Sequence, residues 1–338
     1  MAAVEELPNE IRPVLAGLAE AYGPGVRIEG LHRDGGGASR LTSVFEAVTA
    51  AGERHRLVLR RATPGASEAS SPLAREAALM RAAREAGAPV PEVVAVGDGS
   101  PDGAGATEES ETLEALEYIV MTFIEGETIP RRILRAPELA EAREGLAAEC
   151  GRILAAVHRI PPKAVPDLPG EDQLEAWAQI LDGLGTPYPA LELALRRLSL
   201  NRPESARRVV VHGDFRNGNL MIGPDGVRAV LDWELSHLGD PLEDLGWLCA
   251  KAWRFGASPP VGGFGEYEQL IGAYEEASGT AVDRDAVRWW ELFGTFRWGV
   301  ICAMQTHRHL TGGERSVELA ALGRRVAENE WDLLQALA

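Results

Sequence analysis

The N-terminal third of the chain alternates apolar and polar residues in the manner of strands. Three such stretches, residues 26–33, 41–48 and 55–61, follow a short amphipathic stretch at residues 9–22. The sequence DGGGASR joins the first two stretches and predicts a glycine-rich hairpin. Residues 90–98 and 116–124 predict two further strands, and we expect the acidic connection between them to be a hairpin tip.

Helical periodicity replaces this alternation after residues 122–128. One helix is already predicted at residues 70–87, with Ser71 as its cap, Pro72 in its first turn and Gly87 at its end. Apolar residues recur at helical spacing through residues 139–157, and helical patterns continue at 171–200 and beyond Pro241. We therefore predict an α+β fold: a β-rich N-terminal lobe at residues 1–124, and a mainly helical lobe at 125–338 with one small β-element.

Composition and charge exclude several classes of protein to which the chain could belong. The chain has 338 residues, with 45% hydrophobic and 25% charged residues and a net charge of −17. Such a surface repels nucleic acids and anionic membranes. No stretch approaches the about 20 apolar residues of a membrane helix, and the first residues lack a signal-peptide pattern. The three cysteines lie far apart in the sequence, so we expect no disulfides and no cysteine metal site. These features predict a cytoplasmic protein, monomeric or homodimeric.

The segment HGDFRNGNL places polar residues at fixed offsets between two strand-like runs. His212, Asp214 and Asn219 lie in this loop, and Asp232 ends the second run. A hairpin return would bring Asp232 beside Asn219, so that a carboxylate and an amide oxygen converge. Hard oxygen ligands of this kind suit Mg²⁺, which is usually shared with substrate phosphates. Asp214 is then placed to accept a hydroxyl proton and to aim the oxygen at a phosphorus.

The motifs HGDFRNGN and LDWE resemble the catalytic and metal-binding loops of the aminoglycoside phosphotransferase family, which has the protein-kinase-like bilobal fold. The sequence of the C-terminal half looks most like the branch of this family that is related to phosphotransferase domains linked to acyl-CoA dehydrogenases. This resemblance implies transfer of the γ-phosphate of ATP or GTP, with Mg²⁺, to the hydroxyl of a small molecule. It covers most of the chain.

The resemblance also implies roles for individual residues. Asp214 matches the catalytic aspartate, and Asn219 and Asp232 match the metal ligands. In the N-terminal lobe, Arg60 matches the cation that holds the nucleotide phosphates, and Glu76 matches its ion-pair partner. The remaining matches are the loop over the phosphates (Gly35, Gly36, Gly37, Ala38 and Ser39), the hinge whose backbone binds the purine (Thr122, Phe123 and Ile124), and the bracing acid Asp244.

Several positions allow two interpretations. Arg216 is either a cation that reaches the transferred phosphate or a salt bridge at the rim of the site. Glu76 is either the partner of Arg60 or a solvated helix residue. We expect His212 to be structural and the aromatic residues between Trp289 and Trp298 to be core. Because only main-chain groups are needed at the hinge, we expect side-chain changes at Thr122 to matter little.

Three classes of function remain to be compared. The first is a small-molecule kinase whose acceptor is a hydroxylated acyl thioester or, alternatively, an aminoglycoside. Scattered cations in the helical half, including Arg297 and Arg308, could face the cleft and argue against a polycationic acceptor. The second class is a nucleotide-binding pseudokinase, although none of the matched residues is lost. A protein kinase is disfavoured, because LSHLGDP leads quickly into helix and leaves little room for a peptide platform.

Overall fold

The computed structural model describes residues 11–36, 40–62, 72–98, 117–165, 167–204, 207–313 and 315–338. The chain divides into two compact units. Met1–Glu85, Val90–Glu125 and Ala164–Pro166 form the N-terminal unit, and Ala86–Pro89, Gly126–Lys163 and Asp167–Ala338 form the C-terminal unit. Ser71 and the predicted connection at residues 99–116 lie outside the described residues.

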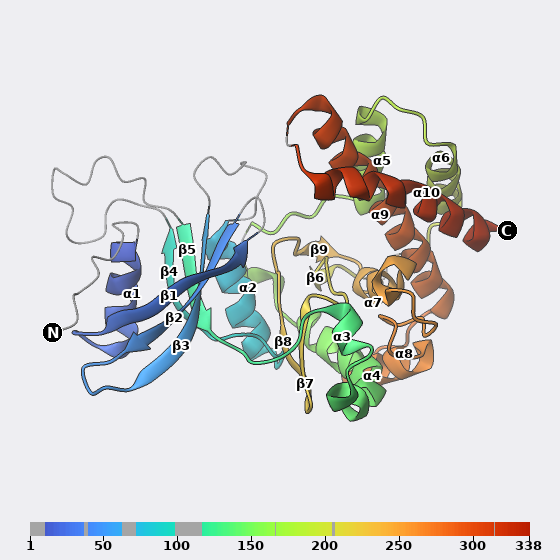
Figure 1. The fold of residues 1–338 in the computed structure, drawn as a ribbon. Helices are drawn as coiled ribbons and strands as arrows, with labels where there is room; N and C mark the ends of the chain where they lie inside the picture. Colours follow the sequence, from blue (N-terminus) through green and yellow to red (C-terminus); the bar gives the residue numbers. More distant parts are fainter. Residues whose placement is uncertain are drawn as a thin grey trace. The chain divides into compact units, whose positions relative to one another are not determined.

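A five-stranded antiparallel sheet forms the body of the N-terminal unit (Figure 1). Its strand order is β1-β2-β3-β5-β4, as the alternating pattern predicts for hairpin-connected strands. The strands are β1 (Arg27–Gly36), β2 (Arg40–Val48), β3 (Arg54–Ala62), β4 (Val93–Asp98) and β5 (Glu117–Thr122).

Helices α1 (Arg12–Tyr22) and α2 (Leu73–Glu85) accompany this sheet. Helix α1 packs along β4, and α2 packs on β4 and β5. The apolar face of α1 buries Val14 and Leu18 against Phe45 and Leu57 of the sheet. Tyr118 completes this core and donates its hydroxyl to the Pro13 carbonyl at 2.9 Å. Gly97 makes room for that ring, because a Cβ there would lie 2.1 Å from a Tyr118 ring carbon.

Helices dominate the C-terminal unit, as the sequence predicts (Figure 1). No helix in the described part of the chain is both long enough and apolar enough to cross a bilayer. The helices are α3 (Pro130–Ile133), α4 (Ala140–Val157), α5 (Gln173–Gly183), α6 (Pro189–Leu200), α7 (Leu242–Cys249), α8 (Tyr267–Ser278), α9 (Arg284–Thr311) and α10 (Val317–Leu337), with 3-10 turns η3 (Pro137–Leu139), η4 (Pro162–Ala164) and η5 (Lys251–Arg254).

The aromatic residues of α9 form a core with helices α5, α6 and α10. Trp289, Phe293 and Phe296 are buried among apolar residues of these helices, including Leu181, Leu191 and Leu333. Rings four residues apart stack, with the Trp289 and Phe293 centroids 5.9 Å apart, because such positions share one helix face. The expectation that these aromatic residues pack as core is confirmed.

The C-terminal unit contains two small antiparallel sheets, whereas the sequence predicted one β-element. One sheet pairs β7 (Leu220–Gly223) with β8 (Gly226–Val230), and the other pairs β6 (Val209–Val211) with β9 (His237–Gly239). The prediction missed β9 because three residues are too few to show an alternating pattern. Its pairing, with Val211 opposite His237, brings the chain after Asp232 back to the strand that precedes Asp214.

Candidate active site

The loop after β6 is held by one buried carboxylate on α7. Asp244 accepts the backbone N–H of His212 at 2.8 Å and that of Gly213 at 2.9 Å. Gly213 has a φ of +79°, and a Cβ there would lie 2.3 Å from the Leu235 carbonyl oxygen. Only glycine fits this turn, so the loop that places Asp214 requires glycine at position 213.

Asp244 remains ionised although it is fully buried. Burial alone would raise the pKa of this carboxyl, but hydrogen bonds and nearby positive charge, led by His158, hold the pKa below its ordinary value. His158 Nε2 lies 3.1 Å from Asp244, and its Nδ1 lies 3.0 Å from the Tyr274 hydroxyl. The predicted bracing role of Asp244 thus has a geometric basis.

His212 ties the loop to the neighbouring hairpin. Its Nδ1 accepts the Asp214 N–H at 3.2 Å, so its Nε2 carries the proton and donates to the Leu231 carbonyl at 3.0 Å. The ring is fully buried beside Phe215 and Trp233, and burial lowers its pKa. A neutral, buried ring with both nitrogens engaged fits the structural role expected from the sequence.

Three side chains donate to the Asp214 carboxylate. Arg216 Nε lies 3.1 Å from Oδ1 and 3.2 Å from Oδ2, and Asn219 Nδ2 lies 2.6 Å from Oδ2. The Trp247 indole N–H donates to Oδ1 at 2.8 Å. Three donors around one carboxylate fix its orientation. The side chain is 13% exposed, so these contacts stabilise a carboxylate that solvent still reaches.

Sequence reasoning did not identify Trp247. It lies one turn after Asp244 on α7, so the same short helix braces the loop and binds the Asp214 side chain. Trp247 packs against Trp253, whose ring faces the Arg216 guanidinium at 4.5 Å. A tryptophan three residues after the bracing acid was the available signal, because that spacing places both side chains on one helix face.

The two candidate metal ligands lie on one hairpin. The Leu231 N–H donates to the Asn219 carbonyl at 2.8 Å, directly beyond the β7–β8 pairing, so Asp232 follows the residue paired with Asn219. Asp232 has a φ of +66°, a left-handed conformation that is strained for a residue other than glycine. The nitrogen of the Asn219 amide donates to Asp214, so its oxygen is the atom that could act as a metal ligand. This donor set fits Mg²⁺.

In the N-terminal unit, Glu76 of α2 is fully buried between two arginines. Arg60 of β3 donates to its Oε2 at 3.1 Å, and Arg40 of β2 donates to its Oε1. The structure therefore brings together Arg60 and Glu76, and the solvated alternative for Glu76 is wrong. The prediction missed Arg40, which directly follows the glycine-rich turn. Two cations of neighbouring strands thus contact one buried carboxylate.

The remaining predicted nucleotide residues lie at the ends of strands. Gly35 and Gly36 end β1, whereas Gly37, Ala38 and Ser39 lie outside the described residues. At the hinge, the N–H of Thr122 donates to the Glu92 carbonyl and that of Phe123 to the Arg56 carbonyl. The N–H donors of these two residues are therefore occupied within the unit. The described contacts leave the Ile124 N–H and the hinge carbonyls as candidates to bind a base.

The Thr122 side chain makes a hydrogen bond that the sequence did not predict. Its Oγ1 accepts the Glu92 N–H at 2.9 Å, while the Thr122 N–H donates to the Glu92 carbonyl at 2.9 Å. This pair of bonds joins the end of β5 to the residue before β4. A side-chain change at Thr122 would remove one of them.

Comparison with protein families decides the membership of this chain. A family model described as "Phosphotransferase enzyme family" matches residues 31–290, which include Asp214, Asn219, Asp232 and Asp244. The chain belongs to this phosphotransferase family. The resemblance inferred from the HGDFRNGN and LDWE motifs is therefore confirmed.

The mouse protein Acyl-CoA dehydrogenase family member 10 is similar to this phosphotransferase. The two are 30% identical over 224 residues, which cover 62% of this chain and 20% of the mouse protein. The chain thus spans about a fifth of the length of this relative. The predicted similarity to phosphotransferase domains linked to acyl-CoA dehydrogenases is also confirmed.

Two solved structures share the fold of this phosphotransferase. A protein from Ralstonia eutropha, provisionally designated an aminoglycoside phosphotransferase, is 25% identical with a TM-score of 0.70, and the match covers 96% of this chain and 98% of that one. Aminoglycoside phosphotransferase APH(4)-Ia, in complex with AMP-PNP and hygromycin B, is 18% identical with a TM-score of 0.59, over 95% and 97% of the two chains. The predicted α+β, kinase-like fold is confirmed.

Proposed function

We propose that this phosphotransferase transfers the γ-phosphate of ATP or GTP to a hydroxyl of a small metabolite. The observation that carries the proposal is the Asp214 carboxylate, oriented by Arg216, Asn219 and Trp247 in a loop held by Asp244. An oriented carboxylate beside hard oxygen ligands is what in-line transfer to an alcohol requires.

Asp214 accepts the proton of the acceptor hydroxyl in this reaction. The new bond forms between the acceptor oxygen and the γ-phosphorus, while the bond from that phosphorus to the nucleotide diphosphate breaks. An alcohol has a pKa far above 7, so its proton moves to Asp214 during or after formation of the new bond. Arg216 balances the charge of Asp214 in the resting protein. Its terminal nitrogens are candidates to contact the transferred phosphoryl group.

Asn219 and Asp232 would hold Mg²⁺ through their side-chain oxygens. When bound, Mg²⁺ neutralises charge on the nucleotide phosphates. The left-handed backbone at Asp232 supports this role, because backbone strain of this kind is common at functional positions. Asn219 would act twice, since its amide nitrogen also orients Asp214.

The N-terminal unit would bind the nucleotide. Arg60, held by Glu76, would bind the phosphates, and the chain from Gly35 to Ser39 would cover them. The 3.1 Å contact between Arg60 and Glu76 supports this role, because it holds the Arg60 side chain in place. A guanidinium binds phosphate oxygens through two N–H groups, so an arginine can replace a lysine here. The purine would dock on the backbone of residues 122–124, with Ile124 offering an N–H that the described contacts leave available.

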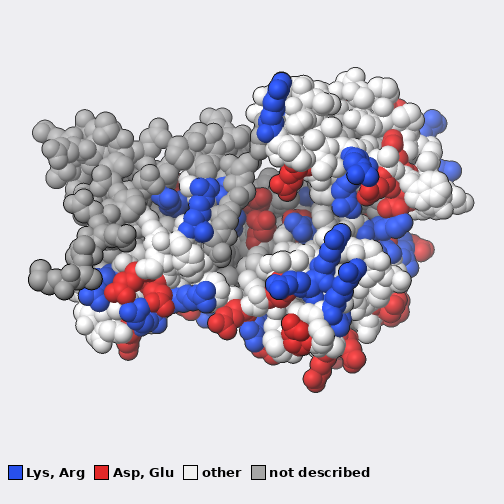
Figure 2. Space-filling view, viewed as in Figure 1, with Lys and Arg blue, Asp and Glu red and all other residues white. Residues whose placement is uncertain are grey.

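We infer that the acceptor is a hydroxylated acyl thioester, with an aminoglycoside as the alternative. The name of the mouse relative, an acyl-CoA dehydrogenase family member, supports the first class, and hygromycin B in the APH(4)-Ia complex supports the second. Basic and acidic side chains are interspersed over the face of the C-terminal unit in Figure 2. A polycation would instead need several carboxylates aimed at it, since single surface pairs contribute little.

One sequence-based argument against a polycationic acceptor was wrong. Arg297 was expected to face a cleft, but it is 3% exposed and lies 3.4 Å from the buried Glu243 carboxylate. A guanidinium at that depth cannot repel a solvated ligand. The preference for an acyl thioester therefore rests on the relative's name and on the mixed surface charge.

A screen for nucleotide consumption tests the proposal. The protein is incubated with Mg²⁺ and ATP or GTP, and hydroxylated acyl-CoAs and kanamycin-type aminoglycosides are added in turn. We expect consumption that rises with a hydroxylated acyl-CoA and is abolished by Asp232→Ala. Efficient phosphorylation of kanamycin-type compounds would reverse the choice of acceptor. Nucleotide binding without turnover by any alcohol would instead favour a nucleotide-binding pseudokinase.

A further inference from the structure

Helix α10 carries apolar residues on two opposite faces. Its inner face packs within the C-terminal unit, where Val326 and Leu333 are buried beside α9. Figure 1 shows α10 at the surface of this unit, near the C-terminus. The outer face consists of exposed residues at alternating spacings of three and four: Val317, Ala320, Arg324, Ala327, Trp331 and Leu334. We propose that this outer face pairs with the same face of a second copy of the chain, so that two antiparallel α10 helices form a homodimer.

Three large apolar side chains of the outer face are in contact with solvent. Val317 is 89% exposed, Trp331 is 62% exposed and Leu334 is 43% exposed. Single exposed apolar residues are ordinary on protein surfaces, but these three share one face of one helix. A helix that only covers its own domain needs one apolar face. A second apolar face with a seven-residue repeat is the pattern of a helix that packs against another helix.

The order of large and small residues on the outer face favours an antiparallel pair of identical helices. In such a pair, Trp331 of one copy lies against Ala320 of the other, so the largest side chain meets one of the smallest. Val317 of one copy lies against Leu334 of the other in the same register. The two-fold axis repeats both contacts, as in other isologous interfaces. A parallel pair would instead place Trp331 against Trp331 and Arg324 against Arg324, which combines crowding with repulsion.

Charge complementarity supports the same register. Arg324 is exposed and has no ion-pair partner in the part of the chain that the structure describes. In the antiparallel pair it lies level with Glu328 of the other copy. The Glu328 side chain is 62% exposed and lies 3.5 Å from Arg325, so its carboxylate can accept a further cation. The two-fold axis forms this ion pair twice, and one register therefore satisfies both shape and charge.

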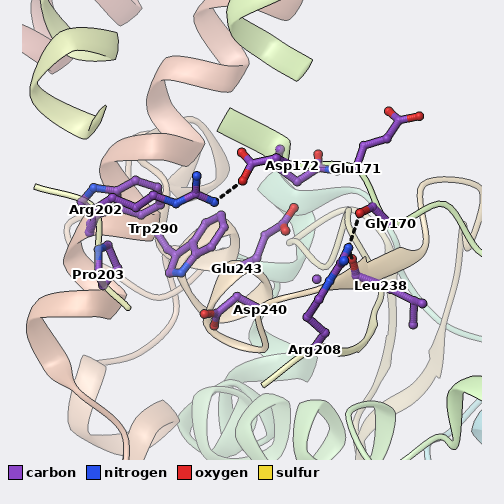
Figure 3. A pocket seen from close by; sticks show the side chains of 13 residues that line it. Gly170, Glu171, Asp172, Arg202, Pro203, Arg208, Leu238, Asp240, Glu243 and Trp290 are labelled. Atoms are coloured by element: carbon purple, nitrogen blue, oxygen red, sulfur yellow. Dashed lines mark hydrogen bonds and ion pairs between the residues drawn. The ribbon is translucent and has the colours of Figure 1, made fainter. Parts of the chain in front are cut away.

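The outer face is separate from the other features of the C-terminal unit. Asp214 and its three donors lie in the loop after β6 and on α7. Figure 3 shows a cavity of about 340 Å³ beside Trp290, between the start of α5, the chain after α6, the β6–β9 pair and α9. None of its described lining residues belongs to α10. The proposed dimer therefore does not depend on the proposed reaction, and a test of one leaves the other open.

Analytical ultracentrifugation of the full chain tests the proposal. One helix per chain gives a small interface, below the roughly 800 Å² per partner of a standard one. We therefore expect a reversible dimer with a Kd of roughly 10–100 µM. Between about 1 and 500 µM protein, the sedimenting mass should rise from that of one chain towards that of two. A single chain at every concentration would overturn the proposal.

Trp331→Ala removes the largest side chain of the outer face. Alanine has the highest helix propensity, and Trp331 is mostly exposed in the single chain, so the fold should be retained. Thermal unfolding at low protein concentration verifies this. Aromatic residues at the centre of an interface contribute strongly to binding, so we expect the dimer Kd to rise by about 30-fold or more. An unchanged Kd would contradict the assignment of α10 as the interface.

Charge reversal tests the antiparallel register. Arg324→Glu and Glu328→Arg each place like charges against each other across the two-fold axis, so each variant alone should dimerise about 10-fold more weakly than the unaltered chain. A mixture of the two variants joins opposite charges at both contacts. We therefore expect the heterodimer to form about 10-fold more tightly than either variant alone. No gain on mixing would refute the register, because effects within one chain cannot produce it.

Arg81→Glu on α2 is the matched control for these variants. Arg81 is also an exposed helical arginine that lies four residues before a glutamate, Glu85. Its reversal makes the same change within one helix but lies in the N-terminal unit. The dimer Kd of this control should stay within about 2-fold of the unaltered chain. A loss equal to that of Arg324→Glu would show that net charge, and not the α10 contact, controls association, and would overturn the proposal.

Discussion

At the residue scale, Asp214 is oriented by donors from two parts of the sequence. Arg216 and Asn219 belong to its own loop, and Trp247 belongs to α7, 33 residues further along the chain. Asp244 on the same helix holds the backbone of the loop. The position of the proposed catalytic carboxylate therefore depends on α7 as much as on the HGD motif.

Replacing Trp247 by phenylalanine should slow catalysis without unfolding the protein. The change removes the 2.8 Å hydrogen bond to Asp214 Oδ1 and keeps an aromatic ring in the core. Hydrogen bonds to charged groups contribute about 1.5–3 kcal/mol, so we expect kcat to fall about 10- to 100-fold. Steady-state kinetics with the acceptor from the screen measures this effect.

Trp253→Phe is the matched control for that variant. Trp253 packs against Trp247, but its own indole N–H has no hydrogen-bond partner in the described part of the chain. Its kcat should stay within about 2-fold of the unaltered protein, because the face toward Arg216 remains aromatic. Equal losses of kcat in the two variants would show that packing, and not the hydrogen bond to Asp214, is responsible.

Replacing Asp244 by asparagine should destabilise the protein in a pH-dependent way. The pKa of Asp244 lies below its ordinary value of 3.8, so its contribution to stability is complete above about pH 4 and is lost as pH falls through the folded-state pKa. Breaking a buried ionic pair costs about 3 kcal/mol. Urea unfolding should show this difference at pH 7 and a smaller one towards pH 3. A difference that is the same at both pH values would contradict the account of Asp244.

At the element scale, strand ends place the candidate site residues. The β7–β8 hairpin brings Asp232 to Asn219, and the β6–β9 pair returns the chain from Asp232 to α7. In the N-terminal unit, the neighbouring strands β2 and β3 present Arg40 and Arg60 to Glu76 of α2. Hydrogen-bonded strands therefore flank each group of site residues and restrict the movement of their backbone.

Replacing Thr122 by valine should weaken the link between β4 and β5. The variant keeps the shape of the side chain but loses the acceptor for the Glu92 N–H. We expect a loss of about 1 kcal/mol in the free energy of unfolding, and weaker nucleotide binding, because the hinge backbone loses one of its restraints. Urea unfolding and nucleotide titration measure the two effects. An unchanged unfolding midpoint together with unchanged nucleotide affinity would instead agree with the expectation from the sequence that side-chain changes at Thr122 matter little.

The sequence predicted well those elements in which the apolar pattern repeats several times or in which a motif has fixed spacing. The five N-terminal strands, α2 and α4 each extend over several repeats of their pattern, and the HGD and LDWE motifs have fixed spacing. The three-residue strand β9 has no period to detect. Arg40, Trp247 and the cavity at Trp290 depend on contacts between residues far apart in the chain. Such contacts are set by tertiary packing and leave little local signal.

At the scale of the whole molecule, the proposed reaction draws on residues of both compact units. The N-terminal unit supplies the buried Arg60–Glu76 pair, and the C-terminal unit supplies Asp214, Asn219 and Asp232. The family match spans both groups of residues, and we propose that they serve one activity. One fold can host many functions, so the identity of the alcohol depends on the side chains that contact it.

The most direct test of this account is the kinetics of Asp214→Asn. The amide lacks the charge and basicity of the carboxylate, so kcat should fall by about 10²–10⁴-fold, or about 3–5 kcal/mol of transition-state stabilisation. Nucleotide affinity, measured by titration with Mg²⁺, should change less than about 3-fold, because the contact proposed for Asp214 is with the acceptor and not with the nucleotide. The unfolding midpoint is measured alongside, since the amide turns an NH₂ group towards one of the present donors. A kcat near that of the unaltered protein with the true acceptor would contradict the account.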